Sequence, residues 1–424
     1  MNRSSKRVVF NYPSRGIGGA QLLFCRIAVG LHSKGYRIAN VDSGESFIST
    51  YLIDNGIPFE HLIASEDNKA NLLKDDILVV SLSYIFIFTK IIKLHGETKI
   101  LFWDLHPYNL IEQTALSYLY KKNNFFYNNK SLRFLERNRI RKIKEIVDSA
   151  HQKESVFFMC KKNFLYSSNF FNLSFIPSYI PIPIPISFNK KPVYDMNNRH
   201  KKEIHIGWIS RLDPDKVGIL NVFISDISDY VKNNPDIKLY LHVIGCGASE
   251  DKIDCLPDQV VRFTGRLEGN ALDNYLRDNI DIGFSMGTSA LEFAARAIPT
   301  VLVPSPTLRK FFMKAERRYL FLNKAKGYDV AVEEYYDEEE RNTFAEILLS
   351  LKTSDTRLAC ESYEYAYASH ALDKVNTLLS SKIQSSGLLY KDFETLVVST
   401  GTNRERVLLY FKSLVKRIVK SKSL

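Results

Sequence analysis

The 424-residue sequence has few cysteines and no arrangement of them that indicates a disulfide framework or a zinc site. The five cysteines are odd in number, widely spaced and never paired as CxxC: Cys25, Cys160, Cys246, Cys255 and Cys360. We therefore expect a reducing compartment and no bound metal.

Long hydrophobic runs are also missing. The most apolar stretch, ILVVSLSYIFIFTKII at 77–92, contains Lys90 and is shorter than the ~20 residues that span a bilayer. The N-terminal segment has a three-residue apolar run before Asn11, which is too short for the core of a signal peptide. These absences favour a cytoplasmic protein, with 77–83 as a buried strand that leads into a helix.

Several nucleotide and hydrolase motifs are absent. A strand, a glycine loop and Asp42 at the end of a second strand suggest a dinucleotide site, but the GxGxxG pattern that starts at Gly16 fails at Gln21. The loop at Gly245 fails in the same way at Glu250. There is no GxxxxGK[ST], HExxH or GxSxG, so a dehydrogenase, a P-loop enzyme, a zinc enzyme and a hydrolase all lack support.

Alternating strand-like and helix-like segments fill most of the chain. The expected strands are 8–13, 37–43, 77–83, 99–105, 156–160, 204–210, 238–247, 260–265, 281–285 and 300–305. This alternation predicts an α/β protein with two doubly wound, Rossmann-like halves. Four prolines in 176–195 indicate the boundary between them. We expect domains at 1–185 and 201–360, followed by a closing helix and basic tail at 361–424.

Motifs in the C-terminal half resemble a known family. The segments GWISRLDPDKV (207–217), LHVIGCG (241–247), VVRFTGRLEGNALDNYLRDNIDIGFS (260–285) and GTSALEFAARAIPTVLV (287–303) resemble the nucleotide-binding domain of GT-B glycosyltransferases, most closely family 4. GIGGAQ (16–21) and, more weakly, DLHP (104–107) extend the resemblance to the N-terminal half. It implies the GT-B fold, in which two Rossmann-like domains face a central cleft, with a C-terminal helical tail.

The resemblance also implies a donor site. Arg211 and Lys216 would hold the donor diphosphate, because negative charge grows on the leaving phosphate and, without a metal, fixed cations must stabilise it. Glu292 would accept hydrogen bonds from the ribose hydroxyls, while Thr288 and Ser289 would face the diphosphate.

Other positions follow from the same resemblance. His106, at the end of an expected strand, would contact the donor sugar, and Asp104 is a weaker candidate. The glycines expected to let the backbone approach the donor are Gly18, Gly19, Gly245, Gly265 and Gly287. The nucleotide sugar is a substrate, and no cofactor is implied.

Structural alternatives stand beside these roles. Arg211 and Lys216 also fit ordinary surface charges, and His106 fits a histidine satisfied by its own loop. Ser289 and Glu292 have the spacing of a helix capping box.

One position departs from the family pattern. The family has two glutamates with seven residues between them, and the earlier place is Phe284 here. The donor sugar and the stereochemical outcome are therefore left open by the sequence.

Positive charge is concentrated in two segments. The net charge is +11, while 121–145 carries a local +7 and 404–422 a local +6. Because apolar residues recur at helical spacing in 404–422, we expect a basic amphipathic helix, suited to an anionic membrane surface. Packing on the protein or dimerisation are alternatives. No recognisable nucleic-acid module accompanies the charge.

These patterns together predict a retaining, metal-independent glycosyltransferase of the hexosyl type. It would lie on the inner face of the cell membrane and transfer sugar from a nucleotide diphosphate sugar to a lipid-linked surface glycan. The alternatives are a non-catalytic glycosyltransferase-like scaffold and a GT-B nucleotide-sugar epimerase.

Overall fold

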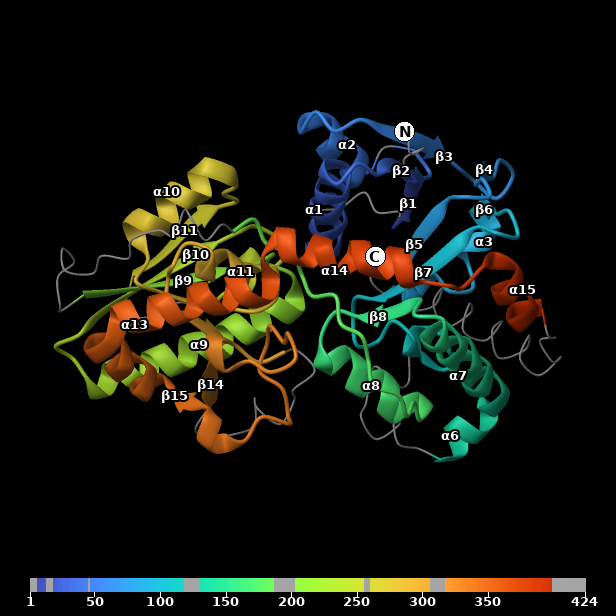
Figure 1. The fold of residues 1–424 in the computed structure, drawn as a ribbon. Helices are drawn as coiled ribbons and strands as arrows, with labels where there is room; N and C mark the ends of the chain where they lie inside the picture. The colour runs from blue at the N-terminus through green and yellow to red at the C-terminus, as the bar shows by residue number, and fades with distance from the viewer. Residues whose placement is uncertain are drawn as a thin grey trace. The chain divides into compact units, whose positions relative to one another are not determined.

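The computed structural model describes residues 6–12, 18–44, 46–117, 130–186, 203–254, 260–305 and 317–398. The chain divides into two compact units (Figure 1). Unit 1 comprises Met1–Pro183 and Asp373–Leu424, and unit 2 comprises Ile184–Leu372. The division after Pro183 lies inside the proline-rich segment 176–195.

Unit 1 contains a parallel sheet of six strands in the order β3-β2-β1-β5-β7-β8. Its strands are β1 Arg7–Asn11, β2 Arg37–Asp42, β3 Phe59–Ile63, β5 Ile77–Ser81, β7 Lys99–Asp104 and β8 Val156–Phe158. The central strands β1 and β5 are buried along their whole length. This burial explains their continuous apolar sequences, since a parallel sheet is covered on both faces.

Helices lie on both faces of this sheet. Phe102 and Trp103 are consecutive in β7 and therefore point to opposite faces. Trp103 meets Phe24 of α1, whereas Phe102 meets Phe393 of α15. The described helices of unit 1 are α1 Gly19–Ser33, α2 Phe47–Asp54, α3 Phe88–Ile91, α6 Lys130–Leu135, α7 Arg137–Gln152, α8 Lys161–Phe171, α14 Leu372–Ser385 and α15 Tyr390–Val398. A two-stranded ladder joins β4 Ala70–Asn71 to β6 Ile92–Lys93.

Helix α14, near the C-terminus, packs along α1, although the two are far apart in the sequence. An added Cβ at Gly30 of α1 would lie 1.7 Å from Nδ2 of Asn376, so the amide occupies the space above this glycine. Lys34 and Tyr36, just after α1, also contact α14. Of the predicted closing segment 361–424, residues up to Leu372 group with unit 2, and those from Asp373 group with unit 1.

Unit 2 contains a sheet of seven strands in the order β11-β10-β9-β12-β13-β14-β15. Its strands are β9 Glu203–Ile209, β10 Lys238–Ile244, β11 Val260–Gly265, β12 Ile282–Ser285, β13 Thr300–Leu302, β14 Arg318–Phe321 and β15 Asn342–Thr343. The strands from β11 to β13 pair in parallel, and β14 and β15 extend the sheet antiparallel. The described helices are α9 Pro214–Asn233, α10 Gly269–Asn279, α11 Thr288–Ala294 and α13 Phe344–His370.

The two faces of this sheet are packed differently. Gly207 of β9 and Gly283 of β12 lie under the ring of Phe293 from α11, and a Cβ at either glycine would overlap that ring. On the opposite face, Phe284 packs against Phe223 of α9. Both units are therefore doubly wound α/β structures, which confirms the predicted fold class.

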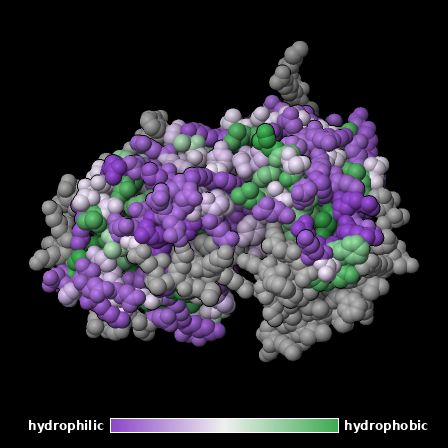
Figure 2. All heavy atoms as spheres, turned by 90° about the horizontal axis from the view of Figure 1, so that it is seen from below, coloured by the Kyte–Doolittle hydropathy of each residue, from purple (hydrophilic) through white to green (hydrophobic). Residues whose placement is uncertain are grey.

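The surface agrees with the composition. On the face drawn in Figure 2, hydrophilic residues predominate among those described, and hydrophobic residues form small separate groups. Within the described part of the chain, no helix is long and apolar enough to cross a bilayer. The four cysteines in that part, Cys25, Cys160, Cys246 and Cys360, are free thiols.

Candidate functional site

The carboxyl ends of the parallel strands in unit 2 bring several predicted residues to one edge of the sheet. Arg211 follows β9, Gly245 follows β10, Gly265 ends β11 and Gly287 follows β12. Ser285 Oγ donates to the carbonyl of the last residue of β9 at 2.9 Å, which joins two of these strand ends. Ligands of open α/β sheets bind at such an edge.

The loop after β10 requires a glycine. Gly245 has φ of +144°, and a Cβ there would lie 1.9 Å from the carbonyl oxygen of Ser210. Its N–H donates to the carbonyl of Gly265 at 2.8 Å. Gly245 and Gly265 thus join the ends of β10 and β11, and Gly245 lets the backbone after β9 approach closely. A ligand role for these glycines stays a prediction.

Lys216 reaches from α9 to the start of α11. Asp213 is the N-cap of α9 and Pro214 its first residue, so Lys216 lies in the first turn. Its half-buried side chain donates from Nζ to Sδ of Met286 at 2.7 Å. A thioether is a weak acceptor, and an ammonium has three donors. The contact with Met286 therefore places the cation beside Gly287.

Arg211 has a different environment. Its side chain is 65% exposed and lies 3.3 Å from the carboxylate of Asp213. Exposed ion pairs contribute little, about 0–1 kcal/mol, so this contact does not hold Arg211 firmly. The structure gives Lys216 a defined contact at the strand edge, whereas Arg211 is exposed, and the ligand role of Arg211 stays a prediction.

Helix α11 begins earlier than a capping box would require. Gly287, with φ of +66°, is the N-cap and Thr288 the first helical residue, so the N-cap position has no side chain to cap the helix. Ser289 is therefore inside the helix, and the predicted capping box of Ser289 with Glu292 is wrong. The positive φ of Gly287, whose N–H donates to the carbonyl of Val330 at 2.7 Å, starts the helix before Ser289 can cap it. Thr288 and Ser289 are half-buried.

Glu292 contacts an arginine in the next turn. Nη1 of Arg296 lies 2.7 Å from Oε2 of Glu292 and also 2.7 Å from its carbonyl oxygen. Nε of Arg296 donates to Oδ1 of Asp273 in α10 at 2.8 Å, and Nη2 contacts the same oxygen. The guanidinium thus lies between two carboxylates. Neither Arg296 nor Asp273 was predicted as a site residue.

Phe284 has a clear structural role. It is fully buried and packs against Phe223 at 4.6 Å, with Tyr319 and Phe344 also in contact. A glutamate here would bury a carboxylate among aromatic rings, which is costly. The missing first glutamate is therefore replaced by a core residue.

In unit 1, His106 is exposed on the loop after β7. Its N–H donates to Oδ1 of Asn109 at 2.9 Å and more weakly to Asp104 Oδ1 at 3.3 Å. Nδ1 accepts the N–H of Tyr108 at 3.3 Å, so the neutral ring carries its proton on Nε2. The loop fixes the backbone and the tautomer of His106.

Asp104 lies beneath this loop and is completely buried. Besides the His106 N–H, its carboxyl group accepts a hydrogen bond from Ser167 Oγ at 3.1 Å. Burial raises the pKa of Asp104 well above its usual range, and these two hydrogen bonds only partly oppose the rise. The burial suits a role in supporting the loop.

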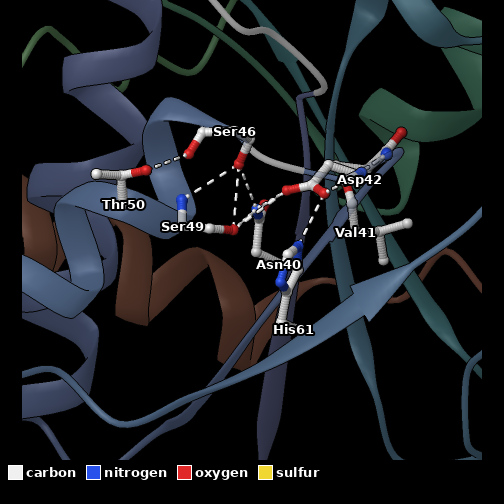
Figure 3. A network of polar contacts seen from close by, with 9 residues as sticks. Asn40, Val41, Asp42, Ser46, Ser49, Thr50 and His61 are labelled. Atoms are coloured by element: carbon white, nitrogen blue, oxygen red, sulfur yellow. Dashed lines mark hydrogen bonds and ion pairs between the residues drawn. The ribbon is translucent and has the colours of Figure 1, made fainter.

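Asp42 at the end of β2 is occupied by its own neighbours (Figure 3). Oδ1 accepts from the Gly44 N–H at 2.9 Å and lies 2.8 Å from His61 Nε2. Oδ2 accepts from Asn40 at 2.7 Å and from Ser49 at 3.2 Å. A carboxylate with four partners has little capacity left for a ribose. The geometry thus agrees with the failed dinucleotide motif.

The remaining glycines of unit 1 lie at the start of α1. Gly18, which has no side chain, is the N-cap, and Gly19 is the first helical residue. Residues 13–17, which include the start of the GIGGAQ motif, are outside the described part of the chain. The roles of Gly18 and Gly19 stay predictions.

The described part of the basic segment 121–145 forms α6 and the first half of α7. Three of its cations contact backbone carbonyls within unit 1: Arg133, Arg139 and Lys142. In contrast, Phe134 is 56% exposed, and Arg137 lies over its ring at 4.5 Å. Part of the charge therefore stabilises the fold. Residues 121–129 and 404–422 are outside the described part.

Comparison with known proteins identifies the fold. No protein-family model and no curated protein matches the chain. The chain is similar to the solved structure of Anabaena HepE in complex with UDP-glucose, with a TM-score of 0.51, 12% identity, and coverage of 89% of this chain and 99% of HepE.

Two further solved structures give the same result. TarM has a TM-score of 0.53 at 12% identity, with 90% of this chain and 99% of TarM covered. A variant of S. aureus TarM in complex with Fondaparinux, alpha-GlcNAc-glycerol and UDP has a TM-score of 0.52 at 12% identity. The match covers 89% of this chain and 99% of the TarM variant. At this identity the likeness shows the fold alone. The two doubly wound units are those of the GT-B fold.

Proposed function

We propose that the protein is a glycosyltransferase that uses a nucleotide diphosphate sugar as donor. Its acceptor is a lipid-linked glycan of surface polysaccharide synthesis. The observation that carries the proposal is the contact of Lys216 with Met286, because it positions a cation at the strand edge beside Gly287. The GT-B fold supports the same class, since HepE and TarM were solved with UDP or UDP-glucose.

The chemistry proposed for this edge is stabilisation of the leaving group. When the bond between the sugar and the diphosphate breaks, negative charge grows on the terminal phosphate oxygen. Lys216 exchanges the weak thioether acceptor for this oxygen, and Arg211 leaves its surface contact with Asp213 to join it. Glu292 receives the ribose hydroxyls. Two cations suffice for this role, so the proposed transfer needs no metal.

The stereochemical proposal is retention. Asp104 and Asp42 are both buried and contact neighbouring side chains of unit 1, so neither is a suitable base for deprotonating an acceptor. In a retaining reaction of this kind the donor phosphate itself assists the deprotonation. His106, held by its loop with the Nε2 proton, contacts the donor sugar, a hexose.

Attachment to an anionic membrane brings the enzyme to its acceptor. Lys130, Arg137 and Arg141 are exposed on α6 and α7, beside Phe134 and Leu135. Lysine and arginine contribute ~1 kcal/mol each near an anionic lipid surface, and an exposed aromatic ring adds apolar contact. Because some cations of this segment contact carbonyls in the fold, we assign the attachment to these exposed residues.

The test uses two lysines of the same helix. Lys216→Met removes the cation beside Gly287, whereas Lys232→Met removes an exposed cation in the last turn of α9 that pairs with Asp229. The first variant should reduce turnover of the donor by roughly 100-fold to 1,000-fold, as when one charge-stabilising donor is lost. The second should leave turnover unchanged. Equal turnover in both variants would exclude the proposed clamp.

A second candidate function is a non-catalytic scaffold, and Phe284 favours it. The position that carries the first glutamate in related enzymes is part of the core here. A scaffold would bind nucleotide but would release none from any donor sugar. Release of nucleotide from UDP-sugars, GDP-sugars and ADP-sugars by the purified protein therefore distinguishes the two functions.

A further inference from the structure

We infer that Arg296 is a positioning residue that orients Glu292 toward the ribose of a bound nucleotide, with Asp273 as its anchor. The inference rests on the proposed function, because it concerns the nucleotide site of unit 2. It adds two residues, one just after α11 and one in α10, that neither the motifs nor the fold assign.

The geometry gives Arg296 little freedom. Its Nη1 donates to two atoms of Glu292, the side-chain Oε2 and the carbonyl oxygen, both at 2.7 Å. Its Nε and Nη2 contact a single oxygen of Asp273 on a different helix. The Arg296 and Glu292 side chains are 19% and 15% exposed, so solvent screens this pair only partly. One guanidinium thus connects α11 to α10.

Contact with Arg296 is compatible with ligand binding by Glu292, because an ionised carboxylate offers about four acceptor positions. A glutamate side chain that is free to rotate loses rotamer entropy when a ligand orders it. A glutamate already held by Arg296 loses less, so the nucleotide binds more tightly. The planar, five-donor guanidinium suits this role, and a lysine in its place could not contact both carboxylates in the same way.

The experiment measures binding by calorimetry with matched ligands. The probes are UDP, GDP and ADP, each beside its 2′-deoxy and 3′-deoxy forms. The wild-type protein should bind the ribonucleotide about tenfold more tightly than a deoxy form, as expected for loss of a hydrogen bond to a charged group. Arg296→Lys should weaken binding of the ribonucleotide by about tenfold. The ratio of the affinities for the ribonucleotide and the deoxy form should then be close to one.

Two further variants complete the design. Asp273→Asn should bring the ratio of ribonucleotide to deoxynucleotide affinity only partway toward one, because it weakens the contact that anchors Arg296 and leaves Arg296 in place. Arg277→Met removes an exposed arginine of α10 that contacts Asp278, and it should leave the ratio unchanged. Circular dichroism and thermal melting of each variant show whether the fold is retained.

The outcomes separate this inference from the proposed function. If Arg296→Lys keeps the wild-type ratio in a folded protein, Arg296 does not position Glu292. If the wild-type protein binds ribonucleotide and deoxynucleotide equally, Glu292 does not contact the ribose. If the wild-type protein binds none of the three nucleotides, the proposed function fails and this inference fails with it.

Discussion

Replacing Gly30 tests how helix α14 packs on α1 within unit 1. Gly30 lies inside α1, and its missing side chain makes room for the amide of Asn376. In Gly30→Ala the new Cβ would lie 1.7 Å from Nδ2, 2.3 Å from Cγ and 2.7 Å from Oδ1 of Asn376. All three distances are far below a van der Waals contact, and Asn376 is buried. Either the Asn376 side chain or helix α14 must therefore shift.

The magnitude follows from two opposing effects. Overpacking of this kind costs about 1–3 kcal/mol. Alanine is preferred over glycine inside a helix by about 1 kcal/mol, which offsets part of the cost. Gly218 of α9 provides a matched control, because it is exposed and an added Cβ there meets nothing within 4 Å. Gly218→Ala should be stabilising by about 1 kcal/mol, and Gly30→Ala less stable than it by about 1–3 kcal/mol.

Urea unfolding of the two variants, with limited proteolysis of the C-terminal helices, measures this difference. The double variant Gly30→Ala with Asn376→Ala removes the overlapping amide and should recover most of the loss. If Gly30→Ala and Gly218→Ala have equal free energies of unfolding, or if the double variant recovers nothing, α14 is not packed on α1 as described.

Three further predictions concern single sites. Burial raises the pKa of Asp104, so this group stabilises the folded state at low pH and loses that contribution as the pH rises through its pKa in the folded state. Urea unfolding should therefore show Asp104→Asn gaining stability relative to wild type between about pH 4 and pH 7. Gly283→Ala should destabilise unit 2 by about 1–3 kcal/mol in thermal unfolding, because its Cβ would lie 2.3 Å from the ring of Phe293. Adding Phe293→Leu to the same chain should recover part of the lost stability. Arg211→Met should raise the KM for the donor and make it less sensitive to salt, as measured by steady-state kinetics from low to physiological ionic strength.

The elements could be predicted because their sequences carry local periodicity. The segment 204–210 was expected as a strand and forms β9 from Glu203 to Ile209, since buried parallel strands are continuous apolar runs. The prediction of a strand over 77–83 was only partly right, because β5 ends at Ser81 and a short 3-10 turn precedes α3. The segment 361–424 was expected to begin with one closing helix, but α13 ends at His370 and a separate helix, α14, follows.

The candidate site was less predictable, because its contacts join residues far apart in the sequence. Lys216 and Met286 are separated by 70 positions, and no local pattern indicates that they meet. Arg296 had a local signal, since it lies four residues after Glu292, the spacing of neighbours on a helix. Its anchor Asp273 had none. The capping box failed because the φ of Gly287 depends on its place after β12, which the spacing of Ser289 does not reveal.

A crystal structure of the protein with UDP-glucose, and with the corresponding GDP and ADP sugars, tests the central claim most directly. Our account predicts a phosphate oxygen within ~3 Å of Lys216 Nζ, in place of the Met286 sulfur, with the ribose hydroxyls on Glu292. A bound nucleotide that leaves Lys216 on Met286 and contacts other residues would contradict it.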